Sequence, residues 1–324
     1  MWFLFAFITF ITWGVADLFY KKGANPSDKY SHLKTVIAVG VVMGLYALVY
    51  MIVEGIEFNP MSMVTYLPVS LMYIISMVLG YVGLRYIALS LSSPIQNSSG
   101  AIVTILCFFI LGETVDIYQA AAIAAIVIGI TSLSFFEGRR ERKLAAAEGE
   151  DKKYRTGLVA LIFPFLYCII DSLGTLFDAF WLDTEVNFLD KLGIDKTSSF
   201  FDMFGFNKSA PILSEDEATL AYMFTFAICA LLIFVYFLIF KREELKTVPN
   251  ASRFGAAAFE TAGQIFYVFA MSGDAIVAAP VVSSYCLVSV ILSRIFLKEK
   301  LTVAQYISIG VALAGIAVLG IYDA

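Results

Sequence analysis

The chain has 324 residues, of which 60% are hydrophobic and 15% are charged, and its formal net charge at pH 7 is −5. A soluble domain carries about 25% charged residues, so this composition, with a mean hydropathy of +0.83, excludes a soluble globular protein. The sequence has no basic tract of the kind that binds nucleic acid, and its four cysteines lie singly within apolar segments, which indicates neither disulfides nor a metal cluster.

Ten apolar spans follow one another along the chain. Each is close to the roughly 20 residues that an α-helix needs to cross a hydrocarbon core about 30 Å thick. The predicted spans are 2–20, 34–53, 64–87, 94–112, 117–136, 157–180, 218–240, 253–272, 277–297 and 301–321. The sequence therefore predicts an all-α, multi-pass protein of the cell membrane, embedded in the lipid bilayer.

The connections between the spans are short, except for two. Residues 137–156 are charged and rich in Ala, Glu and Lys, and residues 181–217 are polar with scattered aromatic side chains. These connections predict three parts: a first five-helix repeat over 1–136, a charged cytoplasmic linker over 137–156, and a second five-helix repeat over 157–324 that carries a polar insertion at 181–217.

An internal duplication relates the two halves at an offset of 186 positions. Between 92–133 and 278–319 the match needs no gap, and it keeps polar residues, a proline and a glycine in phase. The matched pairs include Tyr81 and Tyr267, Pro94 and Pro280, Ser98 and Ser284, Glu113 and Glu299, Gln119 and Gln305, and Gly129 and Gly315.

The basic residues predict the orientation of these repeats. Of the 22 Lys and Arg residues, 19 fall in odd-numbered connections, and the remaining three lie in the 181–217 insertion. Since cytoplasmic loops carry an excess of Lys and Arg, we expect 137–156 in the cytoplasm and both termini outside. Five helices is an odd number, so tandem repeats of five must insert with opposite orientation, a common design of secondary transporters.

This pattern resembles the EamA family of the drug/metabolite transporter superfamily. The resemblance is carried by Pro94 to Ile130 and by Pro280 to Ile316, each with an LxE…Q…GI motif, and by Trp13-Gly14. It covers nearly the whole chain except 181–217. It implies ten helices in two five-helix repeats and a small-molecule substrate. Members of the family are usually drawn with cytoplasmic termini, which departs from the orientation that the charges favour.

Acidic residues within the spans are candidates for solute binding, because charged groups inside a membrane face cavities or partners. An aromatic residue precedes an Asp by one helical turn in the first span of each repeat. The substrate-binding residues that we predict are Trp13, Asp17, Tyr81, Gln96, Asn97, Tyr167, Asp171, Glu260, Gln264 and Tyr267.

Each of these candidates has a purely structural alternative. Asp17 could be an interfacial helix end, and Glu260 could form a local pair with an arginine or with the backbone that only holds helices together. The polar residues that follow Pro94 could serve close packing. We expect Pro94 and Pro280 to open the fourth helix of each repeat. The small-residue rows Gly310/Ala314 and Ala121/Ala125 are expected to be packing seams.

Other function classes lack the residues that they need. The one histidine, His32, lies in a charged connection, so an intramembrane enzyme with a Ser–His dyad or a His-rich metal site is not expected, and no cofactor is predicted. The sequence has no Walker-type phosphate loop, so ATP is not expected to drive the protein directly. It also has no segment that resembles a channel filter. The prediction is a secondary transporter of a small organic solute, proton-coupled or exchanging. Carboxylates beside aromatic rings favour a cationic or drug-like solute, with an amino-acid or metabolite permease or a non-transport membrane protein as alternatives.

Overall fold

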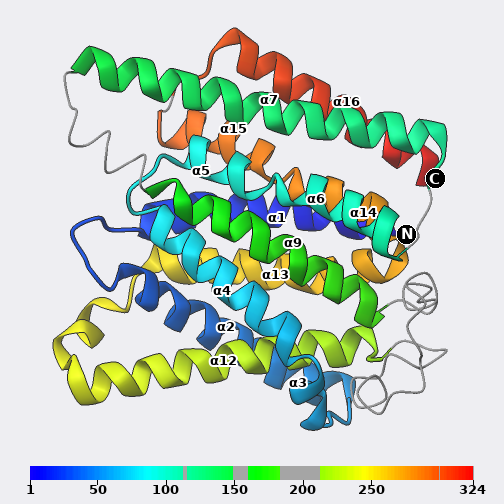
Figure 1. Ribbon diagram of the computed structural model, residues 1–324. Helices are drawn as coiled ribbons and strands as arrows, with labels where there is room; N and C mark the ends of the chain where they lie inside the picture. Colours follow the sequence, from blue (N-terminus) through cyan, green and yellow to red (C-terminus); the bar gives the residue numbers. More distant parts are fainter. Residues whose placement is uncertain (112–114, 149–159, 183–211, 299, 324) are drawn as a thin grey trace.

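A computed structural model describes the chain except residues 112–114, 149–159, 183–211, 299 and 324 (Figure 1). Most of the described residues are helical, and none of them forms a strand. The first part of the chain forms α1 (Trp2–Gly23), α2 (Ser31–Glu54), α3 (Met61–Thr65), α4 (Leu67–Gly83), α5 (Leu89–Gln96), α6 (Ser99–Leu106), a π-helical turn (Cys107–Leu111) and α7 (Ile117–Glu148). The second part forms α9 (Ile162–Leu182), α12 (Glu215–Phe240), a 3₁₀ turn (Arg242–Thr247), α13 (Ala251–Gly273), α14 (Ala275–Ser283), α15 (Cys286–Phe296) and α16 (Val303–Asp323).

The helices are those of a membrane protein. Seven stretches in the described part are long and apolar enough to cross a bilayer, and the shorter α4 is apolar too. Large hydrophobic side chains such as Leu45, Leu232 and Ile239 are exposed on the outer faces of their helices, as expected where lipid covers them. These findings confirm the predicted all-α, multi-pass class.

The long helices lie side by side in antiparallel pairs that combine the two halves of the chain (Figure 1). The principal pairs are α1 with α13, α4 with α9, α2 with α12, and α7 with α16. In the α2–α12 pair, Lys34 meets Glu244 near one end and Tyr50 bonds to Asp216 near the other. The polar centre of the molecule therefore lies between helices of both halves.

Small residues set the close approach of α7 and α16. A Cβ at Gly129 would lie 2.6 Å from the Cβ of Ala312, and a Cβ at Gly315 would lie 2.6 Å from the carbonyl oxygen of Ala122. The predicted seams were wrong by one position: Ala121, Ala314 and Gly310 are exposed, and nothing lies within 4 Å of a Cβ at Gly310. Successive residues of a helix point in directions about 100° apart, so an error of one position selects a different face. Residues that face lipid can be as small and apolar as residues that pack on another helix, so their type does not show which face is packed.

Two helices are interrupted at positions that match to within one residue at the offset of 186. The first break lies at Asn97–Ser98 between α5 and α6, and the second lies at Ser284–Tyr285 between α14 and α15. The breaks are neighbours, because a Cβ at Gly100 would lie 2.5 Å from the hydroxyl oxygen of Ser283.

The two prolines do not open these helices, contrary to the prediction. Pro94 lies inside α5 and Pro280 lies inside α14, each shortly before a break. A proline has no N–H for the carbonyl four residues earlier, so the carbonyl of Ile276 is left without its helical donor. It accepts instead from the Thr104 hydroxyl of α6, 3.4 Å away.

The fifth span is longer than predicted. Helix α7 continues to Glu148, so much of the expected 137–156 linker is helical, while 149–156 lie outside the described residues. Glu137 is fully buried and explains part of this extension. It accepts a hydrogen bond from Ser90 of α5 at 2.8 Å, pairs with Arg140 at 2.9 Å, and accepts from Gln305 of α16.

Candidate functional site

A cavity lined by both polar and aromatic side chains lies at the centre of the bundle. About 60 Å³ of it is open to the centres of water molecules, and one water needs roughly 10–15 Å³ by this measure, so it has room for a few waters. All ten predicted site residues line this cavity: Trp13, Asp17, Tyr81, Gln96, Asn97, Tyr167, Asp171, Glu260, Gln264 and Tyr267. Helical spacing puts these side chains on inward faces, and the pairing of the two halves brings the faces together.

Asp17 is held between the two interrupted helices. Its carboxylate accepts a hydrogen bond from Ser93 of α5 at 2.6 Å and from Ser289 of α15 at 2.8 Å. The side chain is 8% exposed. Asp17 therefore lies within α1 and is not an exposed helix end, because tertiary packing encloses a residue that the sequence places only four positions before Lys21.

Trp13 connects α1 to α13 beside this carboxylate. Its indole stacks on the ring of Tyr267 with 5.1 Å between centroids, and its Nε1 donates to the backbone carbonyl of Glu260 at 3.2 Å. Gly263 permits the contact, because a Cβ there would lie 2.3 Å from the indole. One aromatic wall of the cavity is thus fixed in place.

Asp171 and Glu260 add two further carboxylates to the lining. Glu260 is 8% exposed. Arg85 forms no ion pair with Glu260 among the described residues. Its guanidinium donates hydrogen bonds to the backbone carbonyls of Lys29 at 3.1 Å and Pro26 at 3.4 Å. The alternative in which Glu260 pairs with Arg85 is not found in the described part of the chain.

The cavity lining is acidic and aromatic. It contains Asp17, Asp171 and Glu260, and among the described lining residues there is no Lys, Arg or His. Trp13 and several tyrosines share the wall with these groups. A positively charged solute would meet both carboxylates and ring faces here, two kinds of group that attract cations.

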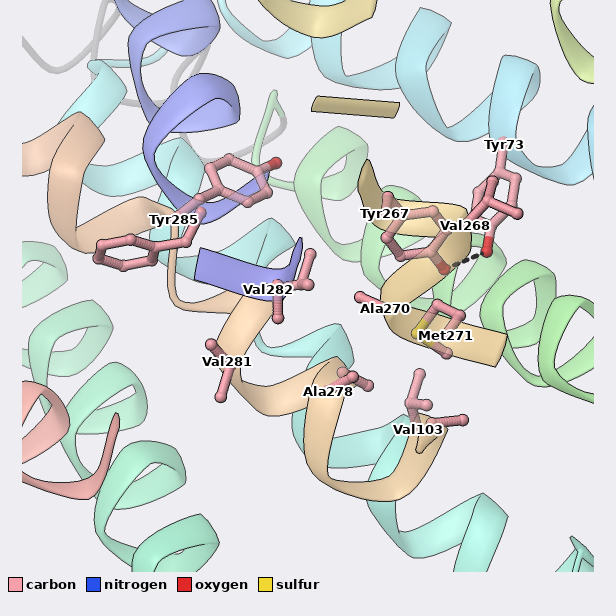
Figure 2. Close-up of a cluster of buried hydrophobic side chains, with 14 of the residues drawn as sticks. Tyr73, Val103, Tyr267, Val268, Ala270, Met271, Ala278, Val281, Val282 and Tyr285 are labelled. Atoms are coloured by element: carbon pink, nitrogen blue, oxygen red, sulfur yellow. Dashed lines mark hydrogen bonds between the residues drawn. The ribbon is translucent and has the colours of Figure 1, made fainter. Parts of the chain in front are cut away.

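Asp178 does not line the cavity, although it shares a helical face with Asp171. It is fully buried and accepts hydrogen bonds from the phenols of Tyr66 and, at 3.3 Å, Tyr73. The Tyr73 hydroxyl lies 2.6 Å from that of Tyr267 (Figure 2). One end of the cavity is therefore closed by a network that joins α4, α9 and α13.

Sequence reasoning did not select several lining residues. Tyr73 and Met77 precede Tyr81 on α4 by eight and four positions, and Tyr222 projects from α12. Helical periodicity from Tyr81 could have found Tyr73. No signal marked Tyr222, because α12 is apolar on all sides and the sequence does not say which face turns inward.

A helical membrane bundle that surrounds an acidic and aromatic cavity has the form of a transporter. The family model described as the EamA-like transporter family matches residues 1–135 and 211–321. The chain belongs to the EamA-like transporter family, which makes it a multi-pass membrane transporter of small solutes and confirms the resemblance seen in the sequence.

The solved structures support the fold. One similar solved structure is described only as the crystal structure of a protein. It shares 12% sequence identity with this chain and has a TM-score of 0.60, and the match covers 99% of this chain and 96% of the other. At this identity the likeness concerns the fold alone. No curated protein matches the chain, so the solute must be inferred from the cavity itself.

Proposed function

We propose that this protein is a secondary transporter of a small organic cation across the cell membrane, driven by protons or working by exchange. The single observation that carries the proposal is the charge of the central cavity, which has three carboxylates and no basic side chain among its described lining residues. A carboxylate within a membrane is costly unless a cavity, a partner or a proton relieves it. A cationic solute would supply that partner.

We further propose that the chain has ten membrane-spanning helices in two inverted five-helix repeats. Reciprocal contacts support this: Gly129 packs on Ala312 while Gly315 packs on Ile126, and these residues exchange places at the offset of 186. Contacts of this kind are typical of a two-fold axis. The axis would lie in the membrane plane, because the partner helices are antiparallel.

Equivalent local structures also support the duplication. The Gln119 side chain accepts from the backbone N–H of Asp116 at 3.0 Å, and Gln305 accepts from that of Thr302 at 2.6 Å. The repeats would occupy 1–136 and 157–324, joined by the cytoplasmic linker 137–156. The insertion at 181–217 lies mostly outside the described residues.

In this proposal Asp171 is the carboxylate that alternates between solute and proton. It lines the cavity from the middle of α9, deep within its span. A cation and a proton would compete for it, and such competition is sufficient for exchange if the two protonation states bind solute unequally. The test is uptake of an organic cation into proteoliposomes under an imposed pH gradient.

We expect Asp171→Asn to fold and to abolish proton-driven uptake, because the amide mimics the protonated acid permanently. The matched control is Asp178→Asn on the same helix, which should lower thermal stability but preserve the pH dependence of uptake. If Asp171→Asn retains the rate and pH dependence of the unmodified protein, Asp171 has no part in coupling, and Glu260 becomes the candidate. If neutral amino acids are transported and cations are not, the protein is the alternative permease.

A further inference from the structure

Two buried tyrosine hydroxyls in the cavity have no hydrogen-bond partner within 3.5 Å among the described residues. Tyr20 of α1 is 5% exposed and Tyr81 of α4 is 6% exposed, and both line the cavity. Neither phenol oxygen has a hydrogen-bond partner within 3.5 Å in the described part of the chain, and the polar group with which each interacts is the hydroxyl of the other tyrosine. Buried polar groups are nearly always satisfied, so two such groups facing one space point to a solute that accepts hydrogen bonds there.

The other end of the cavity shows what a satisfied arrangement looks like. Tyr267 is the residue that matches Tyr81 at the offset of 186, and its hydroxyl is paired with that of Tyr73 (Figure 2). The Tyr222 hydroxyl is 3.2 Å from the sulfur of Met77. Tyr73, Tyr222 and Tyr267 thus have partners for their hydroxyls within 3.5 Å, whereas the buried hydroxyls of Tyr20 and Tyr81 have none.

Tyr20 and Tyr81 form one recognition surface. Their ring centroids are 4.7 Å apart, which brings donors from α1 and α4 together. Glu260 lines the same cavity, and its charge acts on both phenols. The cavity thus offers two hydroxyl groups for an oxygen acceptor and one anion for a cation.

We propose that Tyr20 and Tyr81 determine specificity by donating hydrogen bonds to an oxygen atom of the solute, while Glu260 attracts its charged nitrogen. The solute is then an organic cation with a hydroxyl, ether or carbonyl oxygen near the charged nitrogen. A carboxylate in that place would be repelled by Glu260. This inference rests on the proposed transport of cations and names the class of cation.

The test compares two cations of nearly equal shape. Choline carries a hydroxyl where propyltrimethylammonium carries a methyl group. Binding of each to the purified full-length protein in lipid nanodiscs is measured by titration calorimetry. We expect choline to bind about tenfold more tightly, because the methyl analogue leaves buried donors without an acceptor.

The double variant Tyr20→Phe/Tyr81→Phe should reduce this preference to less than about twofold, because it removes the two donors that distinguish the hydroxyl from the methyl group. Tyr50→Phe is the matched control, since it removes a tyrosine hydroxyl that does not line the cavity and is bonded to Asp216, and it should keep the preference. Equal affinities in the unmodified protein, or a preference that survives in the double variant, would overturn the inference while the transport of cations stands. If neither cation binds, the proposed cation transport fails as well.

Discussion

Replacing Gly315 by Ala tests the contact on which the paired halves depend. The new Cβ would lie 2.6 Å from the carbonyl oxygen of Ala122 and 2.8 Å from Cγ1 of Ile126. A backbone carbonyl cannot turn away as a flexible side chain can, so α7 and α16 must separate. Overpacking of this kind costs about 1–3 kcal/mol.

Gly310→Ala provides the reference for this cost, since it lies on the same helix and nothing is within 4 Å of its Cβ. Both changes gain about 1 kcal/mol of helix propensity, which cancels when the two variants are compared. We therefore expect Gly315→Ala to be less stable than Gly310→Ala by about 1–3 kcal/mol. The measurement is unfolding of the purified protein in mixed micelles with increasing SDS. Equal stability of the two variants would refute the assigned packing of α7 on α16.

Two further predictions concern charge. Partial burial opposes ionisation of Asp28, but hydrogen bonds from Lys34 and the N–H of Tyr30, with nearby positive charge, outweigh it and lower its pKa from 3.8. This stabilisation exists above the unfolded pKa and is lost as pH falls through the folded one. Below about pH 4 the melting temperature should therefore fall more in the unmodified protein than in Asp28→Asn, and parallel curves would contradict this. For orientation, an impermeant thiol reagent applied to intact cells should label Lys196→Cys but not Ala146→Cys in a cysteine-free background. The reverse pattern would invert the predicted topology.

The sequence by itself determined the class of the protein and the identity of the candidate site. Apolar spans of membrane length follow from the thickness of the bilayer, which every backbone segment must cross as a closed hydrogen-bonded helix. The cost of charge in lipid marked Asp17, Asp171 and Glu260 as inward-facing residues, and helical spacing added aromatic neighbours such as Trp13 and Tyr167. The structure places all of these around one cavity.

Only the tertiary structure decided which neighbouring residues face the partner helix, lipid or the cavity. Gly310 and Gly315 are both small residues in an apolar helix, yet Gly315 is packed and Gly310 is exposed. Asp171 and Asp178 share a helical face, yet Asp178 is enclosed by tyrosine hydroxyls while Asp171 lines the cavity. The physical reason is that a helix sequence specifies spacing along one axis. The rotation and partners of each helix depend on close packing between segments that are distant along the chain.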